Sequence, residues 1–380
     1  MHHPLINKQH NDLREQVRAF AEKEIKPLAQ GLDERSEFSV KLTKAMGKTG
    51  LFGMNLPVEF GGRNLDTLSY IIAVEELARV DSSQAATMAA HNSLGITPIY
   101  KYGNSEQQKR LLPSLTSGEG VWAFGLTEPN AGSDARAIET TALLKTNQWV
   151  VNGQKIFITN SASELSKGVT LLANTSDKKG QKEFSAIIVE REVSEYKAEP
   201  IHNKMVWRAA DTGLLTFKNT IVPEQNLLGK KGRGMHYMLE TLDSGRLSIA
   251  AVGLGLAQGA FEMANAYAKK RHQFGKSLSK IHAISDKLAE MDIKLELARN
   301  YLYYSCWLKD NNLSFKKQAA ISKLYTSEIA KQIADEAVQI FGGYGLFKNN
   351  DIERFYRDQR ILGIGEGTTE ILKLVIARSI

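Results

Sequence analysis

The residues Trp149-Val-Val-Asn-Gly-Gln-Lys-Ile-Phe-Ile-Thr159 give the clearest β-sheet signal in a chain that is otherwise rich in helical patterns. β-branched and aromatic residues flank the pair Asn152-Gly153, and an Asn-Gly pair between such runs is a strong signal for a β-hairpin. Further strand-like runs, separated by polar turns, follow at 169–173, 185–190 and 213–217. We therefore predict a central antiparallel β-domain with a tight turn at Asn152-Gly153.

The segments on both sides of this β-region carry the 3.6-residue periodicity of amphipathic helices. Before it, helical patterns cover 12–32, 40–48, 67–80, 83–102 and 105–117. Helix N-caps are expected at Asp66, at Asp81 or Ser82, and at Asn104.

After the β-region the chain contains no proline beyond Pro223, which favours long helices. Helical patterns cover 235–270, 280–309, 315–341 and 368–377. The sequence thus predicts an α+β multidomain protein with an N-terminal helical domain (1–120), a central antiparallel β-domain (121–229) and a C-terminal four-helix bundle (230–380).

Composition limits the class of protein. With 42% hydrophobic and 24% charged residues, the 380-residue chain has the composition of a soluble globular protein rather than a disordered one. The net charge of +7 is spread along the chain, which favours a small anionic ligand, or a basic surface without a partner, over nucleic acid. The longest weakly polar stretch, 247–260, is shorter than the roughly 20 residues of a membrane span.

The start of the chain shows no apolar signal core, so we expect a bacterial-type cytoplasmic protein, with a processed organellar form left open. The single cysteine, Cys306, excludes an internal disulfide framework and fits a reducing compartment. The eight histidines are scattered without metal-ligand spacing, so no metal site is expected.

Glycine-rich segments are the candidate ligand sites, and each has two interpretations. Phe124–Ala135 mixes glycine and hydroxyl residues that let a ligand approach the backbone, or it is a capped connector. Glu366 lies between Gly365 and Gly367, where a desolvated carboxylate would suit a general base, although Thr368 and its neighbours could simply cap the last helix. Two further segments, 271–276 and 339–345, could contact phosphate or a second subunit, or could end helices.

Four motifs nevertheless occur together, in an order that one family shows: Leu126-Thr-Glu-Pro-Asn-Ala-Gly-Ser-Asp134, Arg271-x-x-Phe274-Gly275, Gln339-Ile-Phe-Gly-Gly343 and Glu366-Gly-Thr-Thr-Glu370. From about Asp12 to its C-terminus the chain resembles the flavin-dependent acyl-CoA dehydrogenases, with a motif pattern similar to the short- and branched-chain members. The resemblance implies the three-domain fold of that family, FAD as cofactor and a homotetramer. It also implies a role in fatty-acid β-oxidation with an electron-transferring flavoprotein as electron acceptor.

The resemblance also assigns roles to individual residues. Leu126, Thr127, Phe157, Ile158 and Thr159 match flavin contacts. The FAD diphosphate and adenosine of an adjoining subunit match a second set: Arg271, Phe274, Gln339, Gly342 and Gly343, completed by Thr368 and Glu370. The substrate contacts match Ser133, Asp243 and Arg246 on the CoA side, and Gly365 and Gly367 beside the base.

Glu366 matches the family's catalytic base, which removes the α-proton of an acyl-CoA while a hydride passes from the β-carbon to flavin N5, leaving a trans-2-enoyl-CoA. Its backbone N–H matches the donor to the thioester carbonyl, where enolate charge develops. Some relatives carry the base on the long helix instead, immediately before the arginine that matches Arg246. That position is Gly245 here, which cannot act as a base, so Glu366 is the candidate.

Three residues depart from the family pattern. Gly365 replaces a frequent tyrosine, which favours a short branched or bulkier acyl chain over a short straight one. Phe157 replaces a frequent tryptophan, and Val206 replaces a common glycine in a loop near the substrate entrance. Two alternatives stay open: a flavin oxidase or monooxygenase on the same fold, and a catalytically silent flavoprotein that serves as a binding module.

Overall fold

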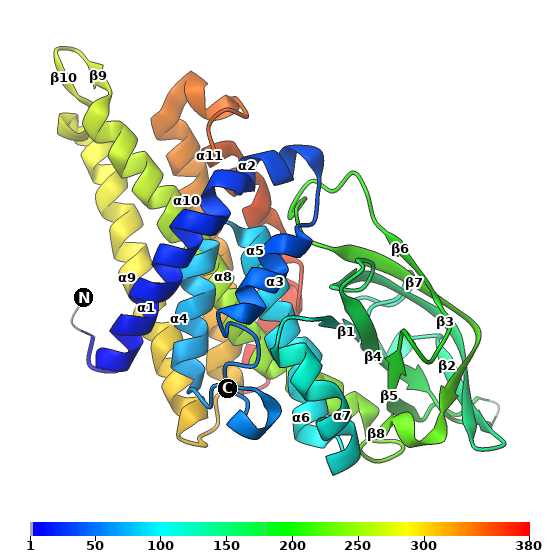
Figure 1. The fold of residues 1–380 in the computed structure, drawn as a ribbon. Coiled ribbons are helices and arrows are strands. Elements are labelled where there is room, and N and C mark those ends of the chain that lie inside the picture. The colour runs from blue at the N-terminus through cyan, green and yellow to red at the C-terminus, as the bar shows by residue number, and fades with distance from the viewer. Residues whose placement is uncertain (1–2, 179) are drawn as a thin grey trace.

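The structure is a computed structural model that describes residues 3–178 and 180–380. In Figure 1 the N-terminal helices (blue to cyan) lie beside the C-terminal helices (yellow-green to red), and the β-domain (green) packs at one side of this helical body. The order helices, β-domain, helices is the one that the sequence predicts.

From residue 3 to residue 120 the chain forms seven α-helices, and the predicted caps are confirmed. Asp66 accepts a hydrogen bond from Ser69 N (2.8 Å), and Asp81 from Ser83 N (2.7 Å). Asn104 caps the last of these helices. The helices are α1 (Lys8–Phe20), α2 (Lys26–Arg35), α3 (Val40–Lys48), α4 (Thr67–Ala78), α5 (Ser82–Ala90), α6 (Thr97–Tyr102) and α7 (Ser105–Thr116).

The helical pattern over 83–102 is interrupted by a π-helical turn, η3 (His91–Ile96). Inside this turn the Asn92 side chain donates to Leu51 O (2.8 Å) and accepts from Gly53 N (2.6 Å). These bonds tie the turn to the loop after α3, and the wider turn directs Leu94 toward the C-terminal helices. Periodicity alone does not reveal such a local widening.

The β-domain is an eight-stranded sheet in the order β6-β7-β3-β2-β4-β5-β8, with β1 paired to β4. Most neighbours are antiparallel, as predicted, but β1 runs parallel to β4 and one residue pair joins β2 and β4 in parallel, so the sheet is mixed. Its strands are β1 (Val121–Gly125), β2 (Thr141–Lys145), β3 (Gln148–Thr159), β4 (Ser166–Asn174), β5 (Phe184–Glu190), β6 (Lys197–Pro200), β7 (Thr212–Pro223) and β8 (Leu227–Leu228).

The predicted hairpin turn at Asn152-Gly153 is wrong, because β3 runs straight through this pair. The turn between β2 and β3 is Thr146-Asn147, where both residues have positive φ (45° and 63°). At Gly153 the register between β3 and β7 shifts, and a Cβ there would lie 2.4 Å from Thr140 Oγ1. The glycine therefore serves a bulge and a close approach inside the strand.

The C-terminal part confirms the four predicted helices to within a few residues and adds a short fifth one, α11. Between α8 and α9 a small hairpin of β9 (His272–Gln273) and β10 (Lys276–Ser277) projects beyond the helices (Figure 1). The helices are α8 (Gly234–Lys270), α9 (His282–Asp310), α10 (Lys316–Phe341), α11 (Ile352–Asp358) and α12 (Thr369–Ala377).

The N-terminal and C-terminal helices share one continuous hydrophobic core. The helix α4 is buried along its whole length, and its two carboxylates are paired: Glu75 with Arg299 (3.0 Å) and Glu76 with Arg18 (2.9 Å). A Cβ at Gly255 would lie 2.2 Å from Glu75 O, so this glycine allows α8 to approach α4 closely.

The length and hydropathy of α8 alone would suit a membrane span, and among the described residues it is the only helix of this kind. However, 78% of its apolar window is buried inside the protein. It is the central helix of the shared core, packed against α4, α9 and α10, rather than a membrane segment.

Candidate functional site

The carboxylate of Glu366 lies directly against α8 at the position of Gly245. A Cβ added to Gly245 would come within 2.4 Å of Glu366 Oε2 and 2.8 Å of Leu94 Cδ2. Three segments far apart in the sequence thus meet at one point: the turn η3, the helix α8 and the loop before α12. The backbone directs the side chain there through an unusual positive φ of 54° at Glu366.

The environment of Glu366 suits a base that works near neutral pH. Its Oε2 atom is buried and has no hydrogen-bond partner among the described residues. Burial raises the pKa of the Glu366 carboxyl to about 7, and the nearby charges of Lys323 and Arg246 oppose this rise. A carboxylate whose pKa matches the working pH is effective in proton transfer.

Two cations lie close to this carboxylate. Arg246 is one turn from Asp243 on α8, and its Nη1 contacts Asp243 Oδ1 at 2.5 Å. Burial raises the pKa of Asp243, which Arg246 and Lys316 oppose. The second cation is Lys323 on α10, whose buried side chain donates from Nζ to Gly367 O at 2.7 Å. Sequence reasoning missed Lys323, although a lysine on the apolar face of a helical pattern is a usable signal.

Hydrogen bonds from β3 hold the loop that begins at Leu126. Lys155 Nζ donates to Leu126 O (3.1 Å) and to Glu128 Oε1 (2.7 Å), and Ile156 N donates to Thr127 O (3.0 Å). Lys155 is fully buried, and burial lowers the pKa of its ammonium group to about 8 against the attraction of Glu128. The ion pair between Glu128 and Lys155 was not predicted from the sequence. It holds the loop at Leu126 and Thr127, the two residues that were predicted to contact the flavin.

The predicted residues of β3 divide into two kinds. A second bulge lies between Lys155 and Ile158, where Phe157 has a φ of 60° and is 65% exposed. Thr159 is half-buried, whereas the Ile158 side chain is only 3% exposed and packs in the β-domain core. Phe157 and Thr159 can therefore present side chains to a ligand, and Ile158 only its backbone. Ser133 is exposed on the loop after Leu126.

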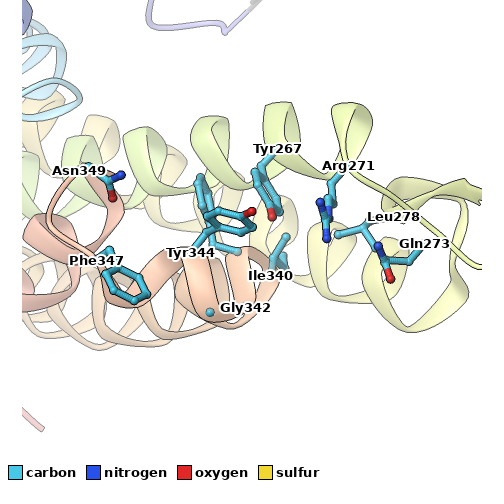
Figure 2. A pocket seen from close by; sticks show the side chains of 11 residues that line it. Tyr267, Arg271, Gln273, Leu278, Ile340, Gly342, Tyr344, Phe347 and Asn349 are labelled. Carbon is cyan, nitrogen blue, oxygen red and sulfur yellow. The ribbon is translucent and has the colours of Figure 1, made fainter.

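A pocket of about 630 Å³ lies between the end of α8 and the end of α10 (Figure 2). Arg271, Gly342 and Gly343 line it, and nothing lies within 4 Å of a Cβ placed on either glycine. Its aromatic wall includes the stacked rings of Tyr267 and Phe341, 4.3 Å apart. Gln339 and the 92% exposed Phe274 lie outside its lining.

Thr368 and Glu370, which were predicted to complete the same site, line a second pocket of about 280 Å³ at the start of α12. Thr368 is the N-cap of that helix, and Lys331 and Arg360 supply positive charge. Within one subunit the two sets of residues therefore lie in different pockets. Among residues 3–178 and 180–380, no group of His, Cys, Asp and Glu side chains could hold a metal ion.

Three domain models of one protein family match consecutive parts of the chain. The N-terminal domain of acyl-CoA dehydrogenases matches residues 7–119, the middle domain 123–220 and the C-terminal domain 232–380. The chain belongs to the acyl-CoA dehydrogenase family. It is therefore a member of a family of oxidoreductases that dehydrogenate acyl-CoA thioesters, and the family and fold class expected from the sequence are confirmed.

Curated relatives cover almost the whole chain. The short-chain specific acyl-CoA dehydrogenase of Clostridium acetobutylicum is 42% identical over 97% of both chains. The human mitochondrial short-chain enzyme is 41% identical over 97% of this chain and 89% of its own.

Solved structures agree with this family. Butyryl-CoA dehydrogenase of Megasphaera elsdenii has a TM-score of 0.94 at 36% identity, covering 100% of this chain and 99% of its own. A chain solved in work on the electron-transferring flavoprotein of Acidaminococcus fermentans has a TM-score of 0.95 at 39% identity over 98% of both chains.

Acyl-CoA dehydrogenases are FAD-dependent, and the Bacillus anthracis member is solved with FAD (TM-score 0.92, 33% identity, 98% of this chain and 66% of its own). The residues present here fit such a group. Arg271 provides a cation beside an aromatic wall, the open glycines Gly342 and Gly343 leave space for close approach, and exposed Phe157 offers a ring face.

Proposed function

We propose that this enzyme converts a short- or branched-chain acyl-CoA to the trans-2-enoyl-CoA, with Glu366 as the base that removes the α-proton. The observation that carries the proposal is the buried, unpartnered carboxylate oxygen of Glu366, held against Gly245 with its pKa raised to about 7. Such a group takes a proton readily from a weak carbon acid positioned beside it.

The reaction needs a second element, because charge develops on the thioester oxygen as the proton leaves. We assign the backbone N–H of Glu366 as the donor to that oxygen. The α-proton ends on the Glu366 carboxylate, and two electrons leave the β-carbon with its hydrogen. FAD, when bound, supplies the acceptor for this hydride equivalent.

The remaining predicted residues supply binding. Arg246, Asp243 and Ser133 are proposed to contact CoA, with Gly365 and Gly367 beside the acyl group. The flavin ring is proposed to lie against Leu126, Thr127, Phe157, Thr159 and the backbone of Ile158. The rest of FAD would lie on Arg271, Phe274, Gln339, Gly342 and Gly343 of a neighbouring subunit, together with Thr368 and Glu370.

Gly365 supports a short branched or bulkier acyl chain. A Cβ placed there would be in ordinary van der Waals contact with Ile361, whose O atom is nearest at 3.6 Å, so the position before the proposed base has room for at least a methyl group. The relatives named short-chain specific support a short substrate.

A homotetramer, an electron-transferring flavoprotein as acceptor, a cytoplasmic location and domain boundaries at 120/121 and 229/230 stay proposals. The similarity to the Acidaminococcus fermentans chain supports the acceptor.

The substitution Glu366→Gln tests the base directly. It keeps the shape of the side chain but removes the proton acceptor, so we expect turnover with acyl-CoA to fall by about 10²–10⁴-fold while FAD stays bound. Glu119→Gln, the same change at an exposed glutamate, is the matched control and should leave turnover unchanged. Steady-state reduction of an artificial dye, with FAD content measured from absorbance, provides both readouts.

Near-normal turnover in Glu366→Gln would contradict the assignment of the base. Rapid reaction of the substrate-reduced enzyme with oxygen would instead favour the flavin oxidase alternative. FAD binding without turnover of any acyl-CoA by the unmodified protein would favour the silent flavoprotein.

A further inference from the structure

We propose that Lys323 is the positioning residue of the base: its ammonium group holds the Glu366–Gly367 turn through the Gly367 carbonyl, and its positive charge favours the carboxylate form of Glu366. The inference rests on the proposed role of Glu366. It concerns a residue of α10 that carries no other role in the site.

The geometry of Lys323 is that of a built contact rather than a solvated lysine. The residue is 0% exposed and lies on the buried face of α10, where its Nζ donates to Gly367 O at 2.7 Å. Taking an ammonium group out of water is costly unless it is paired or hydrogen-bonded. The hydrogen bond from Lys323 Nζ to Gly367 O therefore offsets part of the cost of burying this charge next to the proposed base.

The contact acts on a strained piece of backbone. Glu366 has a φ of 54° and Gly367 a φ of 101°, so two consecutive residues lie in the region that side chains rarely adopt. A non-glycine residue rarely adopts this conformation, and keeps it only when its surroundings fix it. The hydrogen bond to the Gly367 carbonyl fixes the peptide between Gly367 and Thr368, and so holds the turn from which the Glu366 side chain points toward Gly245.

The charges around the carboxylate single out Lys323. Lys323 from α10 and Arg246 from α8 both favour the ionised form of Glu366, while Tyr70 from α4 faces it as a neutral phenol. The charges of Arg246, Glu328 and Glu370 act on Lys323 in addition to that of Glu366.

The two cations are not equivalent. Arg246 is committed to Asp243 at 2.5 Å, and that carboxylate offsets its charge. Lys323 makes no salt bridge among the described residues, so its charge acts on Glu366 without a direct counter-ion. The Lys323 charge lowers the pKa of the Glu366 carboxyl. Removing that charge should therefore raise this pKa, so that Glu366 stays protonated up to a higher pH.

The test is the pH profile of kcat/KM for Lys323→Met, Lys323→Gln and Lys323→Arg in the FAD-loaded enzyme. We expect the acid limb to move up by about one pH unit in the Met and Gln variants, with kcat/KM roughly tenfold lower on the acid side, because an opposite charge nearby lowers a carboxyl pKa by about 1–3 units. The Arg variant keeps the charge and should keep the limb of the unmodified enzyme. Lys317→Met, the same change on the same helix, is the control.

The hydrogen-bonding role has its own readout. Gln can still donate to the Gly367 carbonyl and Met cannot, so kcat on the alkaline plateau should be higher in Lys323→Gln than in Lys323→Met. An unmoved acid limb in both neutral variants would overturn the proposal while leaving the base assignment intact, provided that Glu366→Gln is inactive. An active Glu366→Gln would instead remove its premise.

If Lys323→Met fails to fold, the acid limb of the kcat/KM profile of Lys323→Gln is the test: a shift to higher pH supports the proposal, and an unmoved limb overturns it. Loss of FAD and of the folded state in all three variants, the charge-conserving Arg included, would mark Lys323 as a purely structural residue and overturn the inference.

Discussion

At the scale of the residue, the site depends on a missing side chain. Gly245 leaves the space that the Glu366 carboxylate occupies, and Leu94 closes the other side. Side chains from α8 and from the loop before α12 would thus reach the same point. The sequence shows both positions, but only the folded chain shows that they converge.

The substitution Gly245→Ala should therefore displace the base without affecting the fold. Its Cβ would lie 2.4 Å from Glu366 Oε2, closer than atoms can approach, so we expect kcat to fall by about tenfold or more. Gly253→Ala on the same helix meets its nearest atoms at 3.3 Å, all of them in Thr326 and none in Glu366, and is the control. Steady-state kinetics with FAD content as the check would measure this. Equal kcat in both variants would mean that the carboxylate works elsewhere.

At the scale of the element, β3 holds the loop that begins at Leu126, which is proposed to contact the flavin. Its two bulges turn Phe157 outward and let Lys155 reach Leu126 and Glu128 beneath the loop. Because Lys155 is fully buried and Glu128 only 5% exposed, the pair links the loop to the sheet at a site where neither charge can be satisfied by water.

Lys155→Met should leave the Glu128 carboxylate buried without its cation, which typically costs about 3–5 kcal/mol. We expect a lower melting temperature and weaker FAD retention. The double variant Lys155→Met/Glu128→Gln removes both charges and should recover part of the lost stability. A thermal melt and FAD content measure the cycle, and a double variant no more stable than Lys155→Met would show that the two charges do not act as a pair.

Elements with local signals were predictable from the sequence. Asp66, Asp81 and Asn104 cap helices as expected because a cap is a contact within three residues. Asn152-Gly153 misled because its glycine serves a contact with Thr140 that the local sequence does not show. The parallel pairing of β1 with β4 was missed for the same reason, since strand partners are set by the whole sheet.

At the scale of the molecule, Glu366, the proposed base, lies where the shared helical core meets the loop before α12. The order of the domains follows from the sequence, and so does the candidacy of Glu366. The contacts Glu366–Gly245 and Lys323–Gly367 do not, because they join residues 121 and 44 positions apart that only the packing of α8, α10 and this loop brings together. Arg271 and Thr368, which were predicted to share one cofactor site, line separate pockets of the chain, so a FAD site shared between two subunits stays a proposal.

The most direct test of the central claim is the absorption spectrum of the FAD-loaded protein during addition of acyl-CoA thioesters without oxygen. The panel should include straight and branched chains of increasing length, with the unmodified enzyme and Glu366→Gln side by side. We expect the flavin bands to bleach with short or branched acyl-CoA in the unmodified enzyme and at least about 100-fold more slowly in Glu366→Gln. Equal bleaching rates in the two proteins, or no bleaching with any thioester, would contradict the role of Glu366 as base.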